Sequence, residues 1–210
     1  MNNTIITINR ECGTGGGEIA RLLGEKLGLK VYGRNVLKAV AQQFGTTPEE
    51  MDRIKSQKTS WWGEFCSFYQ QYGAAGYAPG TITDPTPKSV YYAEERFLRD
   101  LAEKESCIIV GRAGFHIFRN NPNAIHLHLL ADRDARIARI ARKQNLTPEE
   151  AAKVVDDVDK ARDNFVESVA ETSRHDARNY HICANITGLE PDAVASFLAE
   201  QIRHKIANVL

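Results

Sequence analysis

Residues 4–28, TIITINRECGTGGGEIARLLGEKLG, decide the fold of this chain. A short β-branched run at 4–9 enters a loop with four glycines in five positions, and an amphipathic helix follows the loop. Only glycine lets successive backbone N–H groups turn toward an anion without a Cβ in the way, and the N-terminal end of the helix adds positive potential. The order strand, loop, helix therefore predicts a phosphate site formed by Gly13, Thr14, Gly15, Gly16 and Gly17.

This loop departs from the standard P-loop pattern. The pattern reads G-x-x-x-x-G-K-[ST], and here Gly16 and Gly17 stand where lysine and Ser/Thr are expected. Arg10 and Arg112 each lie at the end of a predicted strand, and a guanidinium pairs bidentately with phosphate oxygens. Either arginine could therefore supply the missing positive charge. The alternative for both is a surface ion pair with Glu11 or Asp100.

The composition is that of one globular domain over residues 1–210, with an inserted segment at about 55–87 and a helical lid at about 145–175. Lys+Arg and Asp+Glu both total 27, which argues against bulk binding of nucleic acid or of an anionic membrane. The apolar run at 4–9 is too short for a signal peptide, and no run reaches the roughly 18 apolar residues of a membrane span. The four cysteines lack C-x-x-C spacing, which favours reduced, structural thiols in a cytoplasmic protein.

Strand and helix signals alternate along the rest of the chain. Short apolar runs predict strands at 4–9, 30–33, 107–110, 124–130 and 180–184. Helical spacing and two Thr-Pro-Glu-Glu capping boxes predict helices that end at Gly28, cover 35–44, start at 47, and cover 88–105, 132–144, 147–168 and 191–207. This alternation predicts an α/β fold whose parallel sheet is covered by helices on both faces. Ligands of such sheets bind at the carboxyl ends of the strands, where the glycine loop and the Gly111-Arg112 turn both lie.

The chain resembles the cytidylate kinase-like family of bacterial P-loop proteins, relatives of the nucleoside monophosphate kinases. The resemblance rests on the motifs at Arg10–Ala20, Ile109–Gly114 and Ala131–Arg139, on the Asp-Lys-Ala-Arg segment at 159–162, and on the terminal strand at 180–185. It implies a three-layer P-loop NTPase fold that binds ATP, with Mg²⁺ carried by the nucleotide, and a small-molecule acceptor. The family usually has a basic residue where Gly17 stands and an acidic element where this chain has 32–35.

The resemblance also assigns roles to individual residues. Arg136 and Arg139 would contact the nucleotide, although a row of arginines on one helix is usually its solvated face. Lys160 and Arg162 would be cations of the lid that act with Arg10 on the transferred phosphoryl group, although an ion-pair lattice with Asp159 and Asp163 explains them nearly as well. Arg34, Asn35 and Arg112 would bind the acceptor.

Two further groups of side chains leave alternatives open. His126 and His128 alternate on a predicted strand and share a face, but with no third ligand in view we expect a packed or hydrogen-bonded pair and no metal site. Aromatic side chains gather at 57–87, where they could stack on a base or pack against a second subunit, so a homodimer is one hypothesis.

Three functions follow as hypotheses. The first is an ATP-dependent phosphotransferase that acts on a nucleoside monophosphate, with the glycine loop holding the donor phosphates. The second is a nucleotide- or anion-binding regulatory module without catalysis, which the missing lysine supports. The third is a kinase for a non-nucleotide small molecule, because a fold does not fix the acceptor.

Overall fold

A computed structural model describes residues 3–33, 36, 47 and 87–207. The helix predicted at 35–44, apart from Val36, and the aromatic segment at 57–87, apart from Pro87, lie outside these residues, as do Arg34 and Asn35. The described elements are, in chain order, β1 (Ile5–Arg10), α1 (Gly16–Leu27), β2 (Lys30–Tyr32), α5 (Pro87–Lys104), β3 (Cys107–Val110), α6 (Gly114–Ile117), β4 (Ala124–Leu130), α7 (Arg133–Gln144), α8 (Pro148–Ala170), β5 (Ile182–Asn185) and α9 (Pro191–Ala207).

The five strands form one parallel sheet in the order β2-β3-β1-β4-β5. Its central strand, β1, pairs Ile5 with Cys107 of β3 and with Ala124 of β4. The run 107–110 is buried along its whole length, as expected of a strand covered on both faces. The predicted α/β fold is therefore confirmed.

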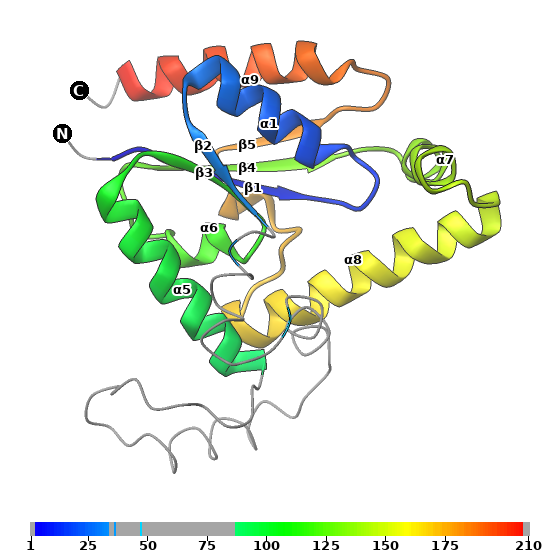
Figure 1. The fold of residues 1–210 in the computed structure, drawn as a ribbon, viewed down its shortest axis with the longest axis horizontal. Helices are drawn as coiled ribbons and strands as arrows, with labels where there is room; N and C mark the ends of the chain where they lie inside the picture. The colour runs from blue at the N-terminus through cyan, green and yellow to red at the C-terminus, as the bar shows by residue number, and fades with distance from the viewer. Residues whose placement is uncertain (1–2, 34–35, 37–46, 48–86, 208–210) are drawn as a thin grey trace.

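Alternate residues of the central strands feed two separate cores. Ile6 and Ile8 pack with α1 and α9 on one face, whereas Ile5 packs with α5, α6 and α8 on the other. Figure 1 shows α1 and α9 above the sheet and α5, α6 and the C-terminal part of α8 below it. This alternation follows from the period of two in a strand, which sends successive side chains to opposite faces.

The two predicted ligand-binding turns meet at one edge of the sheet. β1 leads into the glycine loop and β3 leads into Gly111-Arg112, and the Gly111 N–H donates to the carbonyl oxygen of Ile8 at 2.9 Å. The neighbouring ends of β1 and β3 thus place both turns where parallel sheets bind ligands, as predicted.

Helices α7 and α8 form an arm beside this edge, and α8 occupies most of the predicted lid at about 145–175 (Figure 1). The predicted capping box is present at the start of α8, where Thr147 and Glu150 exchange their hydrogen bonds. A small core joins the arm to the glycine loop, because Cys12 packs against Ile140 of α7 and Val155 of α8. None of the helices in the described ranges combines the length and the apolar character that crossing a bilayer requires.

Some predicted boundaries were wrong. The last strand begins at Ile182 rather than at residue 180, because Tyr180 closes a 3-10 turn over Ala177–Asn179. Helix α8 continues to Ala170, where Glu171 ends it in the left-handed region with φ 50°.

Candidate functional site

The glycine loop presents a set of backbone amides that have no acceptor. Within the described part of the chain, the N–H groups of Gly13, Gly15, Gly16 and Gly17 make no hydrogen bond. Gly15 caps α1 in the left-handed region, and no side chain accepts from the first turn of that helix. These donors and the helix dipole are available to an anion, and the phosphate site predicted from the sequence stays a prediction.

The loop is held from its other side by contacts within the protein. The Thr14 side chain is buried, and its hydroxyl donates to the carbonyl oxygen of Glu11 at 2.9 Å. Arg139 donates to the carbonyl oxygen of Thr14 at 3.3 Å. Asp159 of α8 accepts from the Cys12 N–H at 2.8 Å. Because these carbonyls and this amide are engaged, the remaining amides keep a fixed direction.

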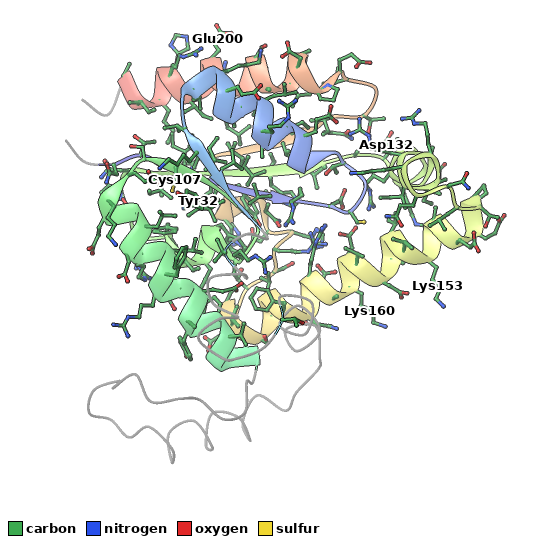
Figure 2. The ribbon with its side chains drawn as sticks, viewed as in Figure 1. Tyr32, Cys107, Asp132, Lys153, Lys160 and Glu200 are labelled. Carbon is green, nitrogen blue, oxygen red and sulfur yellow. The ribbon has the colours of Figure 1, made fainter. Side chains whose placement is uncertain are left out.

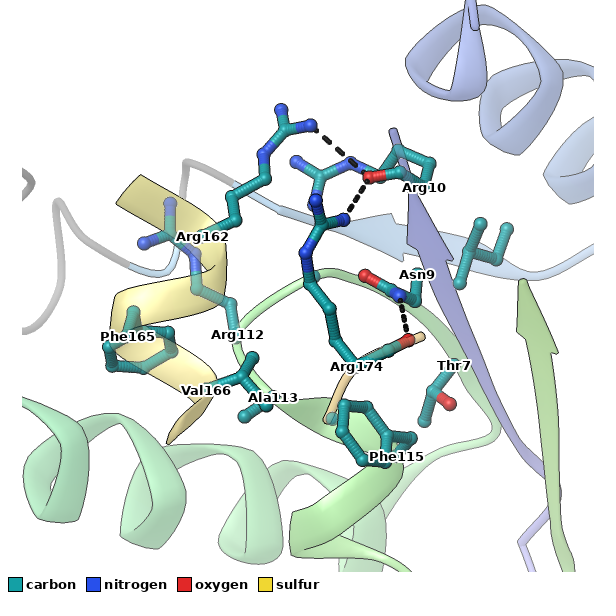
Figure 3. A pocket seen from close by; sticks show the side chains of 13 residues that line it. Thr7, Asn9, Arg10, Arg112, Ala113, Phe115, Arg162, Phe165, Val166 and Arg174 are labelled. Carbon is teal, nitrogen blue, oxygen red and sulfur yellow. Dashed lines mark hydrogen bonds between the residues drawn. The ribbon is translucent and has the colours of Figure 1, made fainter. Parts of the chain in front are cut away.

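Beside the loop lies a pocket of about 40 Å³ lined by four arginines, Arg10, Arg112, Arg162 and Arg174. Figure 3 shows them approaching from β1, the turn after β3, α8 and the segment after α8. No carboxylate lines this pocket among the described residues. The volume suits about three water molecules, the scale of one phosphate or carboxylate group. We call this set the arginine pocket.

Burial, and then the charges of Arg162, Arg112 and Arg174, lower the pKa of Arg10 to about 9. The dominant effect is desolvation, and the three neighbouring guanidinium groups add to it because they repel a further positive charge. A site in which positive charge is this costly gains free energy when an anion enters.

Arg162 and Arg174 both reach the backbone of the loop. Each donates from its Nη1 to the carbonyl oxygen of Arg10, at 3.2 Å and 3.3 Å (Figure 3). Both also contact Asp159 Oδ1, at 3.3 Å and 3.2 Å. The same carboxylate therefore orients two arginines of the pocket and the start of the glycine loop.

Arg174 was missed in the sequence analysis, although its side chain is only 1% exposed. It pairs with Asp163 through its Nε at 2.5 Å, and its carbonyl oxygen accepts from Asn9 at 3.1 Å and from the Tyr180 hydroxyl at 2.7 Å. No spacing pattern surrounds it in the sequence. The spacing of Asp159, Arg162 and Asp163 on one helix was the available signal, because residues three and four apart share a face.

The pairing of Arg112 differs from the expected one. Its partner is Glu94 of α5 at 3.1 Å, not Asp100, and the Glu94 side chain is fully buried. Arg112 itself adopts φ 59°, so the turn after β3 is held in an unusual conformation that places this side chain in the arginine pocket. Buried pairs of this kind fix a side chain rather than add much stability.

Two predicted site residues, Lys160 and Arg136, lie away from the arginine pocket. The structure places Lys160 on the outer side of α8, exposed and pointing away from the sheet, so its action on the phosphoryl group stays a prediction (Figure 2). Arg136 lies behind the loop, where it donates to the carbonyl oxygens of Ala131 and Cys12 and pairs with Asp159 at 2.8 Å. Arg136 thus positions the loop, and its contact with a nucleotide stays a prediction.

The two strand histidines, expected to be a packed or hydrogen-bonded pair, each form a hydrogen bond with a residue of β1. His126 Nδ1 lies 2.8 Å from the Thr7 hydroxyl and His128 Nδ1 lies 2.5 Å from Asn9 Nδ2. Burial lowers the pKa of each imidazole to about 4. No group of three His, Cys, Asp or Glu side chains in the described ranges could hold a metal ion.

The sequence profile of the cytidylate kinase-like family matches residues 5–188. The chain belongs to this family. The cytidylate kinase-like chain is similar in structure to an uncharacterized protein from Eubacterium ventriosum ATCC 27560, with a TM-score of 0.71 and 24% identity over 96% of this chain and 99% of that one. Shikimate kinases from Bacteroides thetaiotaomicron and Acinetobacter baumannii each give a TM-score of 0.52 at 14% identity. They cover 95% and 96% of this chain and 98% and 94% of their own.

These likenesses show that this cytidylate kinase-like protein has the three-layer fold of P-loop kinases. A search of the curated proteins finds no match to it.

Proposed function

We propose that this protein transfers the terminal phosphate of ATP to a nucleoside monophosphate. The observation that carries the proposal is the meeting of the unbonded loop amides with the arginine pocket at one edge of the sheet. The amides suit the donor phosphates, and the arginines suit an anionic group on the acceptor. Membership of the cytidylate kinase-like family supports this acceptor class.

In this reaction an oxygen of the acceptor phosphate attacks the γ-phosphorus of ATP. The bond from that phosphorus to the β,γ-bridging oxygen breaks, and ADP leaves with the electron pair. Both reacting groups are ionised phosphates, so no proton has to be removed. The protein contributes positioning and charge neutralisation, which suits a site made of backbone amides and guanidinium groups.

The residues present fit a Mg²⁺ ion that is carried by the nucleotide. Gly17 offers no hydroxyl at the position where a standard P-loop has Ser/Thr, and the Thr14 hydroxyl already donates to Glu11. When bound with the nucleotide, Mg²⁺ would supply charge neutralisation for the phosphoryl transfer.

Coupled measurement of ADP release tests the proposal, with CMP, dCMP, UMP and shikimate offered as acceptors. We expect turnover with at least one of the nucleotides. Turnover with shikimate alone would assign a non-nucleotide acceptor. Flat traces with every acceptor, beside clear ATP binding by calorimetry, would leave a regulatory binding module.

Replacing Arg112 by lysine tests the role of the arginine pocket. The lysine keeps a charge beside Glu94 but loses the planar fork, so we expect the KM of the acceptor to rise about tenfold. Arg21→Lys is the matched control, because Arg21 is exposed on α1 and pairs only with Glu25 in the described structure. An unchanged KM in Arg112→Lys would remove this residue from the acceptor site.

A further inference from the structure

The glycine loop differs from the P-loop pattern at two positions that mirror each other. In G-x-x-x-x-G-K-[ST], the first glycine falls on Arg10 and the lysine falls on Gly16. This chain thus has a long cation where the pattern has no side chain, and no side chain where the pattern has a long cation. The positive charge therefore lies at position 10, before the loop, and not at position 16, where α1 begins.

The structure shows that the two positions share one space. A Cβ built on Gly16 would lie 2.9 Å from Arg10 Cγ and 3.0 Å from Arg10 Cβ. Arg10 Cβ is fixed by the backbone, so a side chain at position 16 would require Arg10 Cγ to rotate about χ1 and the neighbouring backbone to shift slightly. A side chain at position 16 would therefore crowd Arg10 in its present conformation.

The far end of Arg10 is accommodated by a second glycine. A Cβ on Gly111 would lie 2.4 Å from Arg10 Nη1, and Gly111 has a φ of 76°. The side chain thus leaves the end of β1, passes Gly16 at the start of α1 and reaches Gly111 in the turn after β3, within the arginine pocket. That path brings the end of the pocket that Arg10 forms next to the glycine loop.

The Arg10 guanidinium has no hydrogen-bond or ion-pair partner within the described part of the chain, although its carbonyl oxygen accepts from two arginines. The other arginines nearby are engaged: Arg112 pairs with Glu94, Arg162 and Arg174 pair with Asp159, and Arg139 donates to Thr14. Because no described carboxylate lines the pocket and those nearby are paired with other arginines, the Arg10 guanidinium is arranged for an external anion.

We infer that Arg10 replaces the P-loop lysine and that its guanidinium binds the terminal phosphates of the donor nucleotide. The inference rests on the proposed function, since it assigns the donor to the glycine loop. It also explains why positions 16 and 111 are both glycine, because each leaves room for the Arg10 side chain. A fork of five N–H donors can contact two phosphate oxygens at once, which a lysine cannot do in the same plane.

The test restores the residues of the P-loop pattern at positions 10 and 16. Arg10→Gly, Gly16→Lys and the double variant would be compared with the original protein by calorimetric titration of Mg·ATP and by ADP release. We expect Arg10→Gly to weaken ATP binding about tenfold to a hundredfold, the range of a lost charge-assisted hydrogen bond. We expect Gly16→Lys to weaken ATP binding in the original protein, where its side chain crowds Arg10. In the Arg10→Gly background we expect it to raise ATP affinity at least tenfold, because the lysine then has room.

Controls separate this role from a structural one. Adenosine has no phosphate, so its affinity should not change in any of these variants. Arg21→Ala removes an exposed arginine from α1 and should leave ATP binding unaltered. Arg10→Met keeps most of the side-chain volume without the charge, and it should lose ATP affinity while retaining the thermal midpoint.

The outcomes distinguish the inference from the function on which it rests. If the original protein binds no ATP and releases no ADP, the proposed function fails and the inference fails with it. If the original protein binds ATP but Arg10→Met binds it equally well, or if Gly16→Lys has the same effect in both backgrounds, the inference alone is overturned.

Discussion

Gly13 shows how one residue without a side chain determines the shape of the phosphate loop. It adopts φ 85°, a region that other residues enter only with strain, and α7 lies directly against it. A Cβ at this position would lie 2.7 Å from the carbonyl oxygen of Arg136 and 2.8 Å from its Cβ. The glycine is therefore required twice, once for the turn and once for the close approach of the helix.

Replacing Gly13 by alanine should lower the free energy of unfolding by at least about 2 kcal/mol, because backbone strain adds to a clash with atoms that cannot move aside. Gly17→Ala is the matched control for stability. Nothing lies within 4 Å of a Cβ there, and residue 17 belongs to α1, where alanine is the better helix former. Urea unfolding would measure both variants. An equal decrease in the free energy of unfolding in both variants would show that the contact of Gly13 with α7 does not contribute to stability.

At the scale of the element, α8 combines an outward polar face with an inward face that organises the site. Asp159 is the centre of that inward face. Its carboxylate accepts from the Cys12 N–H and pairs with Arg136, Arg162 and Arg174, so one side chain connects α8 to the glycine loop and to α7. The arm that the sequence predicts as a lid is thus bonded to the loop that it would cover.

Removing this carboxylate should loosen both the arm and the loop. Asp159→Ala leaves Arg136 and Arg174 buried beside one another without their shared anion, and breaking a buried pair in this way costs about 3 kcal/mol or more. We expect a lower denaturation midpoint together with weaker ATP binding. Asp156→Ala serves as the control, because Asp156 lies on the same helix, is exposed and pairs with Arg133.

We expect little change in the denaturation midpoint or in ATP binding of Asp156→Ala, since solvent screens an exposed ion pair. If Asp159→Ala were as stable as Asp156→Ala, the connection between α8 and the loop would not contribute to stability.

At the scale of the whole molecule, the two faces of the sheet differ in polarity. The face under α1 and α9 is apolar, whereas the face under α5, α6 and α8 contains the pairs Thr7–His126 and Asn9–His128. Both pairs are in register across β1 and β4. They form a buried polar row that ends near Arg174, since Asn9 bonds to its carbonyl oxygen.

This row makes stability depend on pH. Burial lowers the pKa of His126 and of His128 from 6.5 to about 4, with smaller effects from His181 on the first and from Arg174 and His175 on the second. Between these pKa values the unfolded chain binds protons that the folded protein does not bind. The contribution of the two histidines to the free energy of unfolding is therefore fully present above about pH 6.5 and decreases as the pH falls toward 4. We expect a loss of roughly 1–2 kcal/mol per histidine at pH 5.

Urea unfolding at pH 7, 6 and 5 would measure this dependence, with His126→Gln as the test variant and His204→Gln as the control. His204 is an exposed residue of α9. The free energy of unfolding should fall less steeply with decreasing pH in His126→Gln than in the original protein and in His204→Gln. A slope that is the same in all three proteins would rule out the buried histidine as its source.

Much of the fold follows from local patterns in the sequence. The apolar run at 107–110, the glycine loop before α1 and the Thr-Pro-Glu-Glu box before α8 each specify their element through contacts between near neighbours. The edge at which the site lies also follows, because parallel strands place their carboxyl ends together.

Which side chains enter the site was decided only by the tertiary structure. Lys160 and Arg162 are two residues apart on a helix and point to different faces, so packing against the sheet admits Arg162 alone. Arg174 reaches the loop from more than 160 residues away, because buried ion pairs with Asp159 and Asp163 hold it there. Strands and turns arise from short-range geometry, whereas the direction of a charged side chain depends on partners that only the folded chain brings together.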